Sequence, residues 1–593
     1  MGAVRSTMQD VLLTVGSLVH HARTVHGRAP VSTAVGPGST PSVTDVAGVH
    51  AAAVALSHGL RALGVTGDQA VATLEWNTAG HLAAYVAVPS MGAVLHPVNP
   101  RLAAEDIAHV LDVAGDVVVV VSADLVPVLA GALAAGPLPR ALRHVVVTGP
   151  RWAAGRPGDP APADVTELAD LPDLAGLPGV AVHDIGPLTA GHPADVDWTD
   201  PDARRVDETD AAAIGFSSGT TGRPRGVAWS HRSVYLHSMG MALPGAFGMG
   251  PADTVAPIVP MAHVLAWGLP YSSLLVGAGQ VLPNRWTDAA SLAALFTATR
   301  PTRAAAVPSV WSALLAHLDG RPDGPDVLAG VTEVLVGGAA VTPALVDGFR
   351  DRYGVRVLHA WGMTETSPLG AVARPDTHAH TRSGGAHEAY EAHEAHEATV
   401  RSQRLSQGRL ATGVRARVVG PDGSVLPADG VTVGELQVRG PWVAAGYVTD
   451  EAGGVDGTRR DWLATGDLAS LDGAGYLRLT DRIRDVVKSG GEWISPSRLE
   501  GLLRAHPGVA DVVVLGVVDE RWGERPLAAV VPADPSAPPA ATDLAAHLAT
   551  SLPRWQVPQA WAVLDAVPLA VTGKPDKRAL RARWDAGSLQ RLA

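Results

Sequence analysis

The chain has 593 residues, more than one ordinary domain holds, and 47% of them are hydrophobic, so a large buried core is possible. Its net charge of −12 argues against a general nucleic-acid binder, whose surface is usually basic. The chain has no cysteine, which excludes disulfides, zinc–thiolate sites, iron–sulfur clusters and a cysteine nucleophile. No secretory signal and no apolar run near the roughly 20 residues of a membrane helix occurs, so we expect a cytoplasmic, multidomain protein.

Hydrophobic periodicity predicts alternating helices and strands in the first part of the chain. We expect helices at 46–64 and 79–92 and short, buried strands at 69–76, 116–121 and 143–149. This alternation predicts βαβ units and mainly parallel sheets. The following segment, 150–208, is rich in Pro, Asp and Gly and is predicted to be loop.

The segment 376–400 is rich in histidine and glutamate, with His387, His393 and His396 in a period-3 repeat. A metal site is one interpretation, but the zinc-binding pattern HExxH does not occur here, because His393 and His396 are spaced at i, i+3. We therefore favour a solvated, Glu-rich helix or loop.

After residue 410 the pattern becomes strand-rich, and from about 486 onward it indicates a small α+β unit. The first region combines helices with buried strands, whereas the last is short and mixed. We place a domain boundary near Arg484.

The stretch "FSSGTTGRPRGV" at 216–227 has the composition of a phosphate-binding loop. Hydroxyls, glycines that let the backbone come close, and cations are what hold phosphates. The preceding "AAAIGF" is typical of a strand, so the loop is expected at the carboxyl end of that strand, where α/β proteins bind ligands. An ordinary Gly/Ser/Thr turn is the alternative. The residues concerned are Ser217, Ser218, Gly219, Thr220, Thr221, Gly222, Arg223 and Arg225.

This stretch resembles the phosphate loop of the adenylate-forming superfamily, which includes acyl-CoA synthetases, peptide-synthetase adenylation domains and luciferases. Further motifs follow in that family's order: "AWGMTETSP" at 360–368, "ATGDLA" at 464–469, "TDRIRDVVKSGGEWIS" at 480–495 and "PLAVTGKPDKRAL" at 568–580. The blocks at 75–102, 259–271 and 334–341 are similar to those of medium- and long-chain fatty acyl-CoA synthetases. The resemblance therefore covers nearly the whole chain.

The resemblance implies an α/β fold: a large N-terminal domain of mainly parallel sheets flanked by helices, with a β-rich subdomain, and a small mobile α+β C-terminal domain. The expected parts are an N-terminal domain at 1–481, a hinge at 482–488 and a C-terminal lid at 489–593. The lid is expected to rotate about the hinge, which brings Lys574 to the first half-reaction and withdraws it for the second. Gly490 and Gly491 suit a segment that absorbs dihedral change.

The implied activity is ATP- and Mg²⁺-dependent activation of a small-molecule acid as an acyl-adenylate, followed by transfer to coenzyme A. The implied catalytic residues are Lys574, Thr364, Glu365 and His263, with Ser217 and Glu365 as magnesium ligands. The implied nucleotide contacts are the loop residues Ser217 to Gly222, Arg225, Gly338, Ala360, Trp361, Thr364, Asp467, Arg482, Arg484 and Lys488. The implied substrate pocket comprises Ala262, Val264, Leu265, Trp267 and Trp493. A homodimer is expected by the same analogy, without a nucleic-acid partner or a membrane span.

The chain departs from the family pattern at a few positions. Arg225 stands where the family usually has Lys, and Trp361 replaces the usual Tyr, although an indole can stack on adenine as well. His359 and Ala360 replace Gln-Gly. Ala262 and Leu265 replace the Phe and Asn of the fatty acyl relatives. We therefore expect intact ATP chemistry and an altered substrate pocket.

The altered pocket leaves other functions open. Some bacterial relatives in natural-product pathways are ATP-dependent diazotases, which activate nitrite as an adenylate that an aryl amine intercepts. Transfer of the acyl group to a carrier protein is a related possibility. A catalytically silent nucleotide-binding homologue is a third, although the presence of Glu365, Asp467 and Lys574 argues against it.

Overall fold

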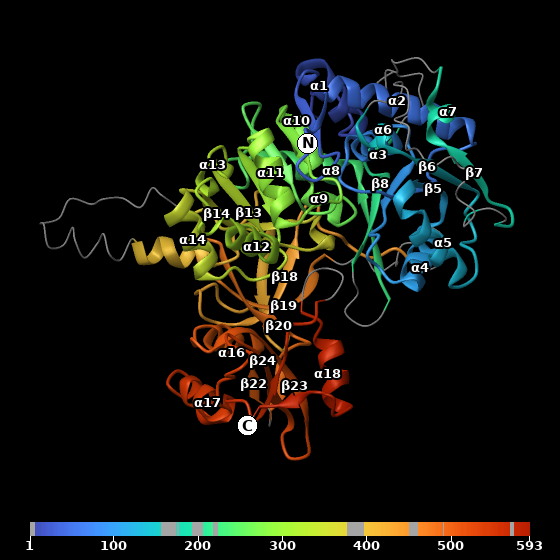
Figure 1. Ribbon diagram of the computed structural model, residues 1–593. Coiled ribbons are helices and arrows are strands. Elements are labelled where there is room, and N and C mark those ends of the chain that lie inside the picture. The colour runs from blue at the N-terminus through green and yellow to red at the C-terminus, as the bar shows by residue number, and fades with distance from the viewer. Residues whose placement is uncertain are drawn as a thin grey trace, which may run out of the picture. The chain divides into compact units, whose positions relative to one another are not determined.

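The computed structural model describes residues 6–155, 174, 177–191, 206–217, 223–375, 397–449, 461–489, 492–569 and 575–592. By their contacts the residues form two compact units. The first unit comprises Met1–Val414 and Arg439–Leu463, and the second comprises Arg415–Val438 and Ala464–Ala593. Each unit contains both strands and helices (Figure 1).

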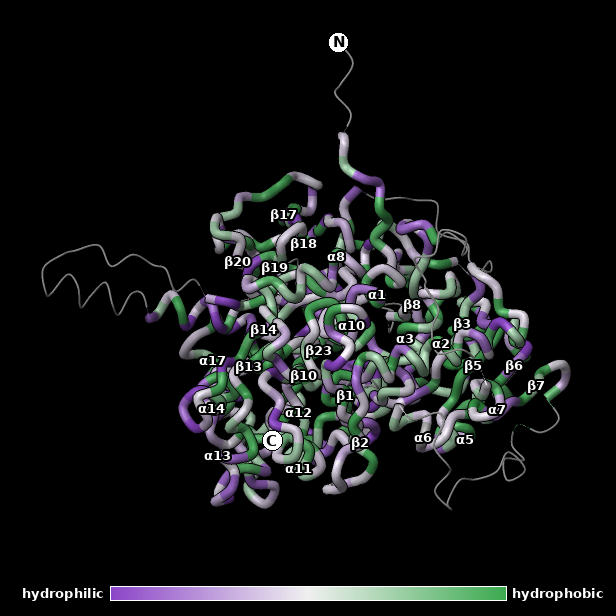
Figure 2. The backbone as a smooth tube through the Cα atoms, turned by 90° about the horizontal axis from the view of Figure 1, so that it is seen from above, coloured by the Kyte–Doolittle hydropathy of each residue, from purple (hydrophilic) through white to green (hydrophobic). Residues whose placement is uncertain are grey.

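The first sheet of the first unit is built from the short, β-branched segments that the sequence predicts as strands. Its order is β7 (Ala181–Asp184), β6 (His144–Thr148), β5 (Asp116–Ser122), β3 (Ala70–Leu74), β4 (Val94–Pro97), β8 (Ala211–Ser217) and β9 (Arg225–Ser230). All neighbours are parallel except β8 and β9, which form an antiparallel hairpin. Both β3 and β5 are largely buried and show the hydrophobic colour in Figure 2, as expected of parallel strands covered on both faces.

The direction in which strands are added to this sheet reverses at β3. The next strand, β4, pairs on one side of β3, whereas β5 returns to pair on the other side. In open α/β sheets a reversal of this kind leaves a crevice at the carboxyl ends of the strands, where ligands bind.

The second sheet of the first unit is also mainly parallel at its centre. Within this unit its order is β16 (Gly408–Leu410), β15 (Leu369–Val372), β14 (Arg356–Gly362), β13 (Glu333–Val336), β12 (Arg303–Ala306), β10 (Thr254–Pro257), β11 (Gly279–Leu282), β1 (Pro30–Thr33) and β2 (Ser42–Asp45). The central pairs from β1 to β14 are parallel, and β2, β15 and β16 are antiparallel additions. The ends of β14 and β15 therefore meet in a turn within the motif "AWGMTETSP" at 360–368. We call it the adenine motif, because its Trp361 is expected to stack on adenine.

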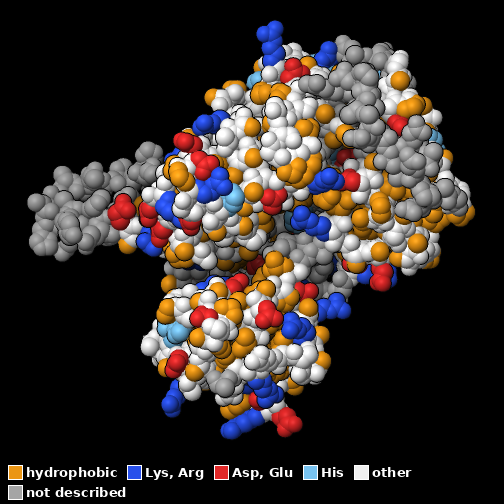
Figure 3. Space-filling model, in the orientation of Figure 1, with side chains coloured by type: hydrophobic (Ala, Val, Ile, Leu, Met, Phe, Trp, Pro, Cys, Tyr) orange, Lys and Arg blue, Asp and Glu red, His pale blue; other side chains and the backbone are white. Residues whose placement is uncertain are grey.

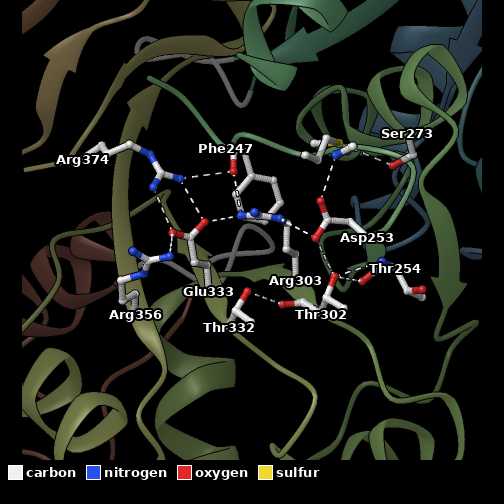
Figure 4. A network of polar contacts seen from close by, with 12 residues as sticks. Phe247, Asp253, Thr254, Ser273, Thr302, Arg303, Thr332, Glu333, Arg356 and Arg374 are labelled. Atoms are coloured by element: carbon white, nitrogen blue, oxygen red, sulfur yellow. Dashed lines mark hydrogen bonds and ion pairs between the residues drawn. The ribbon is translucent and has the colours of Figure 1, made fainter. Parts of the chain in front are cut away.

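A buried ionic network joins the first residues of the central strands of this sheet (Figure 4). Glu333, at the start of β13, is 1% exposed and pairs with Arg303, with Arg356 at 2.8 Å and with Arg374 at 2.9 Å. Burial opposes ionisation of Glu333, but the three guanidinium groups outweigh it and lower the pKa of this carboxyl. The network lies at the amino ends of the strands, away from the ligand-binding edge.

Helices cover the sheets of the first unit with apolar faces. These helices are α1 (Val15–His26), α2 (Val46–Ala62), α3 (Ala79–Ser90), α4 (Ala104–Ala114), α5 (Val126–Ala134), α6 (Pro150–Ala153), α7 (Ile185–Thr189), α8 (His231–Ala242), α9 (Val264–Trp267), α10 (Leu269–Val276), α11 (Ala289–Thr299), α12 (Pro308–Leu318), α13 (Gly324–Val327) and α14 (Pro343–Tyr353). Leu111 of α4 and Leu129 of α5 share a core with Val119 of β5. On the second sheet, Phe296, Trp311 and Phe349 of α11, α12 and α14 are the largest fully buried side chains of the core.

The second unit holds an antiparallel run of strands and a small α+β layer. The run is β17 (Arg415–Val419), β18 (Gly434–Arg439), β19 (Leu463–Leu471) and β20 (Tyr476–Arg482). The layer contains β22 (Glu492–Ile494), β21 (Val487–Ser489), β24 (Gly523–Pro532), β25 (Ala560–Val563) and β26 (Gln590–Arg591), with β23 (Val509–Asp519) paired to β24. Successive side chains of β23 point to opposite faces: Val512 packs toward α16 (Pro496–Arg504) and α17 (Ala541–Ala549), whereas Val513 packs toward α18 (Lys577–Asp585).

The structure confirms the predicted α/β class and most of the predicted elements. The helices predicted at 46–64 and 79–92 are α2 and α3, and the predicted strands are β3, β5 and β6. The prediction of loop for 150–208 is wrong at 150–153, which form the short helix α6, and at 181–189, where the short edge strand β7 leads into α7. A four-residue strand that pairs on one side only carries too weak a hydrophobic pattern to be seen in the sequence.

Two other expectations concern parts that the structure leaves open. Residues 397–405 are helical, in line with the Glu-rich helix or loop, and 376–396 lie outside the described residues. Residues 415–438 and 464–481, which we expected in the N-terminal domain, belong to the second compact unit by their contacts. The predicted hinge at 482–488 concerns motion, and it stays a prediction.

The described surface is mixed in charge. Figure 3 shows basic and acidic side chains interspersed with apolar ones over the visible face. Among the residues that the structure describes, no helix has the length and apolar character that crossing a bilayer requires.

Candidate active site

The predicted phosphate loop connects β8 to β9. Ser217 is the last residue of β8 and pairs in register with Arg225, the first residue of β9. The Ser217 hydroxyl donates to the carbonyl of Arg225 at 3.4 Å. The connecting residues Ser218, Gly219, Thr220, Thr221 and Gly222 lie outside the described residues. The two ends of the loop are thus held together at the carboxyl end of a strand, as the sequence predicts.

The predicted adenine motif forms the turn between β14 and β15. The Trp361 ring lies directly against Gly370, where a Cβ atom would come within 2.3 Å of the indole. Any other residue at 370 would displace the ring, so this glycine sets where the indole lies. Trp361 is 6% exposed.

The predicted magnesium ligand Glu365 follows in a short 3₁₀ turn, Thr364–Thr366, and is 4% exposed. The carboxylate accepts one hydrogen bond from the described residues, donated by the hydroxyl of Tyr447 to Oε1 at 2.7 Å. A buried carboxylate with so few partners is costly unless something else neutralises it. Its hard oxygen donors therefore fit a divalent cation such as Mg²⁺.

The described ends of the phosphate loop and the magnesium turn are neighbours within the first unit. Trp229 of β9 donates its indole N–H to the carbonyl of Thr364 at 3.0 Å. Tyr447 contacts both Glu365 and Arg225. Its hydroxyl donates to Glu365, and the guanidinium carbon of Arg225 lies 3.5 Å from the centre of its ring. Sequence reasoning missed Tyr447: nothing in "AAGYVTD" distinguishes its tyrosine from an ordinary packed one.

Three residues of the predicted substrate pocket, Val264, Leu265 and Trp267, lie on a strained turn. Val264, Leu265, Ala266 and Trp267 all have left-handed backbone angles, with φ of 49°, 52°, 48° and 59°. The left-handed region costs a residue other than glycine about 1–2 kcal/mol, so surrounding contacts must hold this turn in place. Sequence reasoning does not predict this turn, because only Gly268 in this stretch suits such angles.

The turn brings Trp267 to the adenine motif. A Cβ atom at Gly337 would lie 3.2 Å both from Cη2 of Trp267 and from the carbonyl oxygen of Ala360. Gly338 follows with φ of +83°. Three of the predicted residues, Trp267, Gly338 and Ala360, are therefore close together, while His263 precedes the turn and is partly buried.

Buried histidines border this region in their neutral form. Burial lowers the pKa of His359, which precedes Ala360, to about 4. Burial also lowers the pKa of His237, whose ring packs against Gly268, to about 3. Neither imidazole is a cation at neutral pH.

Ala262 lines a small cavity at the carboxyl ends of β3 and β4, where the sheet order reverses. Glu75, Trp76, Arg101 and Arg285 also line it. Glu75 is 3% exposed, and Thr148 donates a hydrogen bond to its Oε1. Burial raises the pKa of Glu75 to about 8, so the carboxyl is mostly protonated at neutral pH. The cavity next to this departure from the family pattern is therefore lined by a protonated acid and two arginines as well as by apolar side chains.

The second unit holds the motif "ATGDLA" at 464–469, whose Asp467 is a predicted nucleotide contact. Asp467 on β19 is 2% exposed and pairs with Nε of Arg482 on β20 at 2.9 Å, so two of the predicted contacts lie together. Nε of Arg484 lies 3.7 Å from Oδ1 of the neighbouring Asp485. Lys488 and Trp493 face each other in register on β21 and β22, and both are exposed. Lys574 lies outside the described residues.

In the first unit, the predicted phosphate loop and the predicted magnesium ligand follow the carboxyl ends of strands of an α/β structure. The sequence matches the model of the AMP-binding enzyme family over residues 41–448 and that of the AMP-binding enzyme C-terminal domain over residues 498–574. The chain therefore belongs to the AMP-binding enzyme family. The resemblance to the adenylate-forming superfamily is confirmed.

Curated relatives match nearly the whole chain. The chain is 38% identical over 575 residues to the 3-methylmercaptopropionyl-CoA ligase of Ruegeria pomeroyi, which covers 96% of this chain and 97% of that protein. It is 36% identical over 575 residues to the medium-chain-fatty-acid–CoA ligase of Ectopseudomonas oleovorans, which covers 96% of each. The predicted proximity to fatty acyl-CoA synthetases is thereby confirmed.

A solved structure supports the fold. The crystal structure of the anthranilate CoA ligase AuaEII in complex with anthranoyl-AMP matches with a TM-score of 0.77, covering 99% of this chain and 100% of that one. At 20% identity this likeness concerns the fold alone.

Proposed function

We propose that this protein is an ATP-dependent, AMP-forming ligase that activates a carboxylic acid as an acyl-adenylate and transfers the acyl group to coenzyme A. The observation that carries the proposal is the 38% identity, over nearly the full length of both chains, to a protein named as an acyl-CoA ligase. Buried Glu365 and exposed Arg225, near each other at strand ends, support it.

The substrates supply the nucleophile in both half-reactions. A carboxylate oxygen bonds to the α-phosphorus of ATP as the bond to pyrophosphate breaks. The sulfur of coenzyme A then bonds to the acyl carbon, AMP leaves with the carbon–oxygen bond electrons, and the thiol proton goes to solvent. The protein's contribution is positioning and charge neutralisation, which need no nucleophilic side chain.

Residues of the first unit are proposed to hold the triphosphate and the adenine. Ser217 and Glu365 are proposed to bind Mg²⁺, which when bound neutralises phosphate charge. Arg225 is proposed to bind phosphate oxygens with the hydroxyls of 217–222. Its charge is available for this, because among the described residues it forms no ion pair. Trp361 and Ala360 are proposed to hold adenine, with Gly338.

Residues of the second unit are proposed to hold the ribose and to complete the reaction. Asp467 is proposed to accept hydrogen bonds from the ribose hydroxyls, with its carboxylate oriented by Arg482 at 2.9 Å. Arg484 and Lys488 are proposed nucleotide contacts. Lys574 is proposed to bridge the acid and the α-phosphate as negative charge develops, and a rotation at 482–488 is proposed to withdraw it.

The acid is proposed to bind beside Ala262, Val264, Leu265 and Trp267, with His263 between the acid and the nucleotide. The small size of the cavity beside Ala262, and the presence of Glu75 and Arg101 in its wall, favour a short or functionalised acid over a long alkyl chain. Trp493 is a proposed contact of the second half-reaction. The cytoplasm, which supplies ATP and coenzyme A, is the proposed site of action, and a homodimer is proposed from the family resemblance.

The test is a single incubation of the purified protein with ATP, Mg²⁺, coenzyme A and a mixture of short, medium, long and aryl acids, together with nitrite and an aryl amine. Products are identified by mass spectrometry. Lys574→Ala is expected to abolish product formation, because the charge on the transition state loses its cation. Lys577→Ala, a matched change at a lysine that pairs with Glu500 at 3.1 Å, is expected to keep it.

Each outcome decides between the functions. Acyl-CoA and AMP establish the ligase and identify the acid. A diazo product with AMP and no thioester overturns the ligase proposal in favour of a diazotase. ATP binding without pyrophosphate release identifies a silent homologue, and acyl-adenylate that coenzyme A does not discharge points to a carrier-protein acceptor.

A further inference from the structure

A short segment that no sequence motif includes joins the phosphate loop to the magnesium turn. Its backbone bonds to both: the N–H of Ala444 donates to the carbonyl of Glu365 at 2.7 Å, and the N–H of Val448 donates to the carbonyl of Gly226 at 2.8 Å. At the start of the segment, Trp442 donates its indole N–H to the carbonyl of Leu369 at 2.9 Å. The segment 442–448 is thus fastened to β9 on one side and to the β14–β15 turn on the other.

The side chain of Tyr447 repeats this connection. Its hydroxyl donates to Oε1 of Glu365 at 2.7 Å, and the guanidinium carbon of Arg225 lies 3.5 Å from the centre of its ring. Glu365 is 4% exposed, whereas Arg225 is exposed. One aromatic side chain therefore contacts the proposed metal ligand with its polar end and the proposed phosphate ligand with its face.

We propose that Tyr447 is a positioning residue for the metal–triphosphate site, which orients the Glu365 carboxylate through its hydroxyl and the Arg225 guanidinium through its ring. This inference rests on the roles of Glu365 and Arg225 in the proposed function. The hydroxyl of Tyr447 donates to Oε1 of Glu365 and fixes the plane of this carboxylate, so Oε2 is the oxygen presented to a cation. The ring binds the flat face of the guanidinium, so its N–H edges stay available to phosphate oxygens.

The pairing also gives a reason for the departure at 225. A lysine ammonium is a compact point charge on a flexible stem, whereas the planar guanidinium of arginine stacks on an aromatic face and presents a fixed set of donors. With Tyr447 beneath it, Arg225 keeps the charge of the usual lysine and gains a defined orientation.

The test separates the two contacts of Tyr447 by calorimetric titration with ATP, in the presence of Mg²⁺ or of a chelator, without acid or coenzyme A. Tyr447→Phe removes the hydroxyl and keeps the ring. Because a hydrogen bond to a charged group is lost, we expect the affinity for Mg·ATP to fall about tenfold and that for metal-free ATP to stay unchanged. Tyr447→Leu also removes the ring, so we expect both affinities to fall.

Tyr235→Phe is the matched control, since it makes the same change on α8 of the same unit, at a partly buried tyrosine outside the site. It is expected to bind both ligands as the wild type does. Thermal melting of all variants reports whether they are folded. The inference is overturned if Tyr447→Phe, folded as the wild type is, keeps wild-type affinity for Mg·ATP, or if it loses equal affinity for both forms of ATP. Because the titration needs no acid, it is independent of whether acyl-CoA is the product.

Discussion

Two buried glutamates in the first unit show how differently a carboxylate can be accommodated. Glu333 begins β13 and is surrounded by Arg303, Arg356 and Arg374 (Figure 4). Glu365 follows the carboxyl end of the neighbouring strand β14 and accepts one hydrogen bond, from Tyr447, among the described residues. Both are less than 5% exposed.

The two carboxylates differ in what neutralises their charge, because they lie at opposite ends of neighbouring strands. Three cations satisfy Glu333 within the protein, so this carboxylate is a structural connection between strand ends. Glu365 pairs with no cation among the described residues, which is why we propose that a ligand neutralises its charge. Burial alone does not identify a functional acid, and it is burial with few partners that makes Glu365 a candidate.

The largest expected effect comes from breaking the Glu333 network. In Glu333→Gln the three guanidinium groups lose their common counterion, and two of them are mostly buried. We expect the free energy of unfolding to fall by about 3 kcal/mol, as when one partner of a buried ion pair is removed. Chemical denaturation measures this loss. Activity per folded molecule should not change, and a selective loss of kcat would contradict the structural role.

The second prediction concerns the other carboxylate, Glu365. In Glu365→Gln the Tyr447 hydroxyl keeps an acceptor, so we expect unchanged or higher stability. We expect the rate of acyl-adenylate formation to fall about a hundredfold, because the proposed Mg²⁺ ligand loses its charge and the cation that neutralises the phosphate is held less tightly. Pyrophosphate release and thermal melting are the two measurements. A stability loss without a change in Mg²⁺ dependence would assign Glu365 to the same class as Glu333.

The sequence predicted the parts of this site that are continuous in the chain. The loop at Ser217 and the turn at Glu365 are each coded by a short run of residues, and each lies at the end of a strand. Asp467, in the second unit, is coded by a similar run but lies within β19. The fold was predictable for the same reason, since the Val-rich runs of β5 and β6 show their burial directly.

The sequence does not show what depends on packing between distant segments. Tyr447 acquires its role only because segment 442–448 bonds to both Gly226 and Glu365. The left-handed turn at 264–267 opposes the local preference of its Val, Leu, Ala and Trp residues, so no local rule predicts it. Glu75 looks like an ordinary residue after a strand, and only its cavity and its burial reveal a protonated acid.

The third buried glutamate, Glu75, extends the comparison to a carboxyl that is neutralised by a proton. Its pKa of about 8 lies above its ordinary value because burial penalises the charged form. The protonated form is favoured in the folded state, so its contribution to stability is fully present below the unfolded pKa and is lost as the pH rises through 8. Between pH 6 and pH 8 this carboxyl should lower the free energy of unfolding by about 2 kcal/mol.

Glu75→Gln replaces the protonated acid by a neutral group of the same shape that can still accept from Thr148. We therefore expect the variant to lose this part of the pH dependence and to be more stable than the wild type at pH 8, while at pH 5 the two should be similar. Denaturant titrations at both pH values measure the difference. If the wild type and the variant have parallel pH profiles, Glu75 ionises normally in the folded state, and a hydrogen-bonded anion like Glu365 is then the right description of it. The outcome also bears on the substrate, since a protonated Glu75 presents a hydrogen-bond donor to the cavity beside Ala262, whereas an ionised one would repel a second carboxylate there.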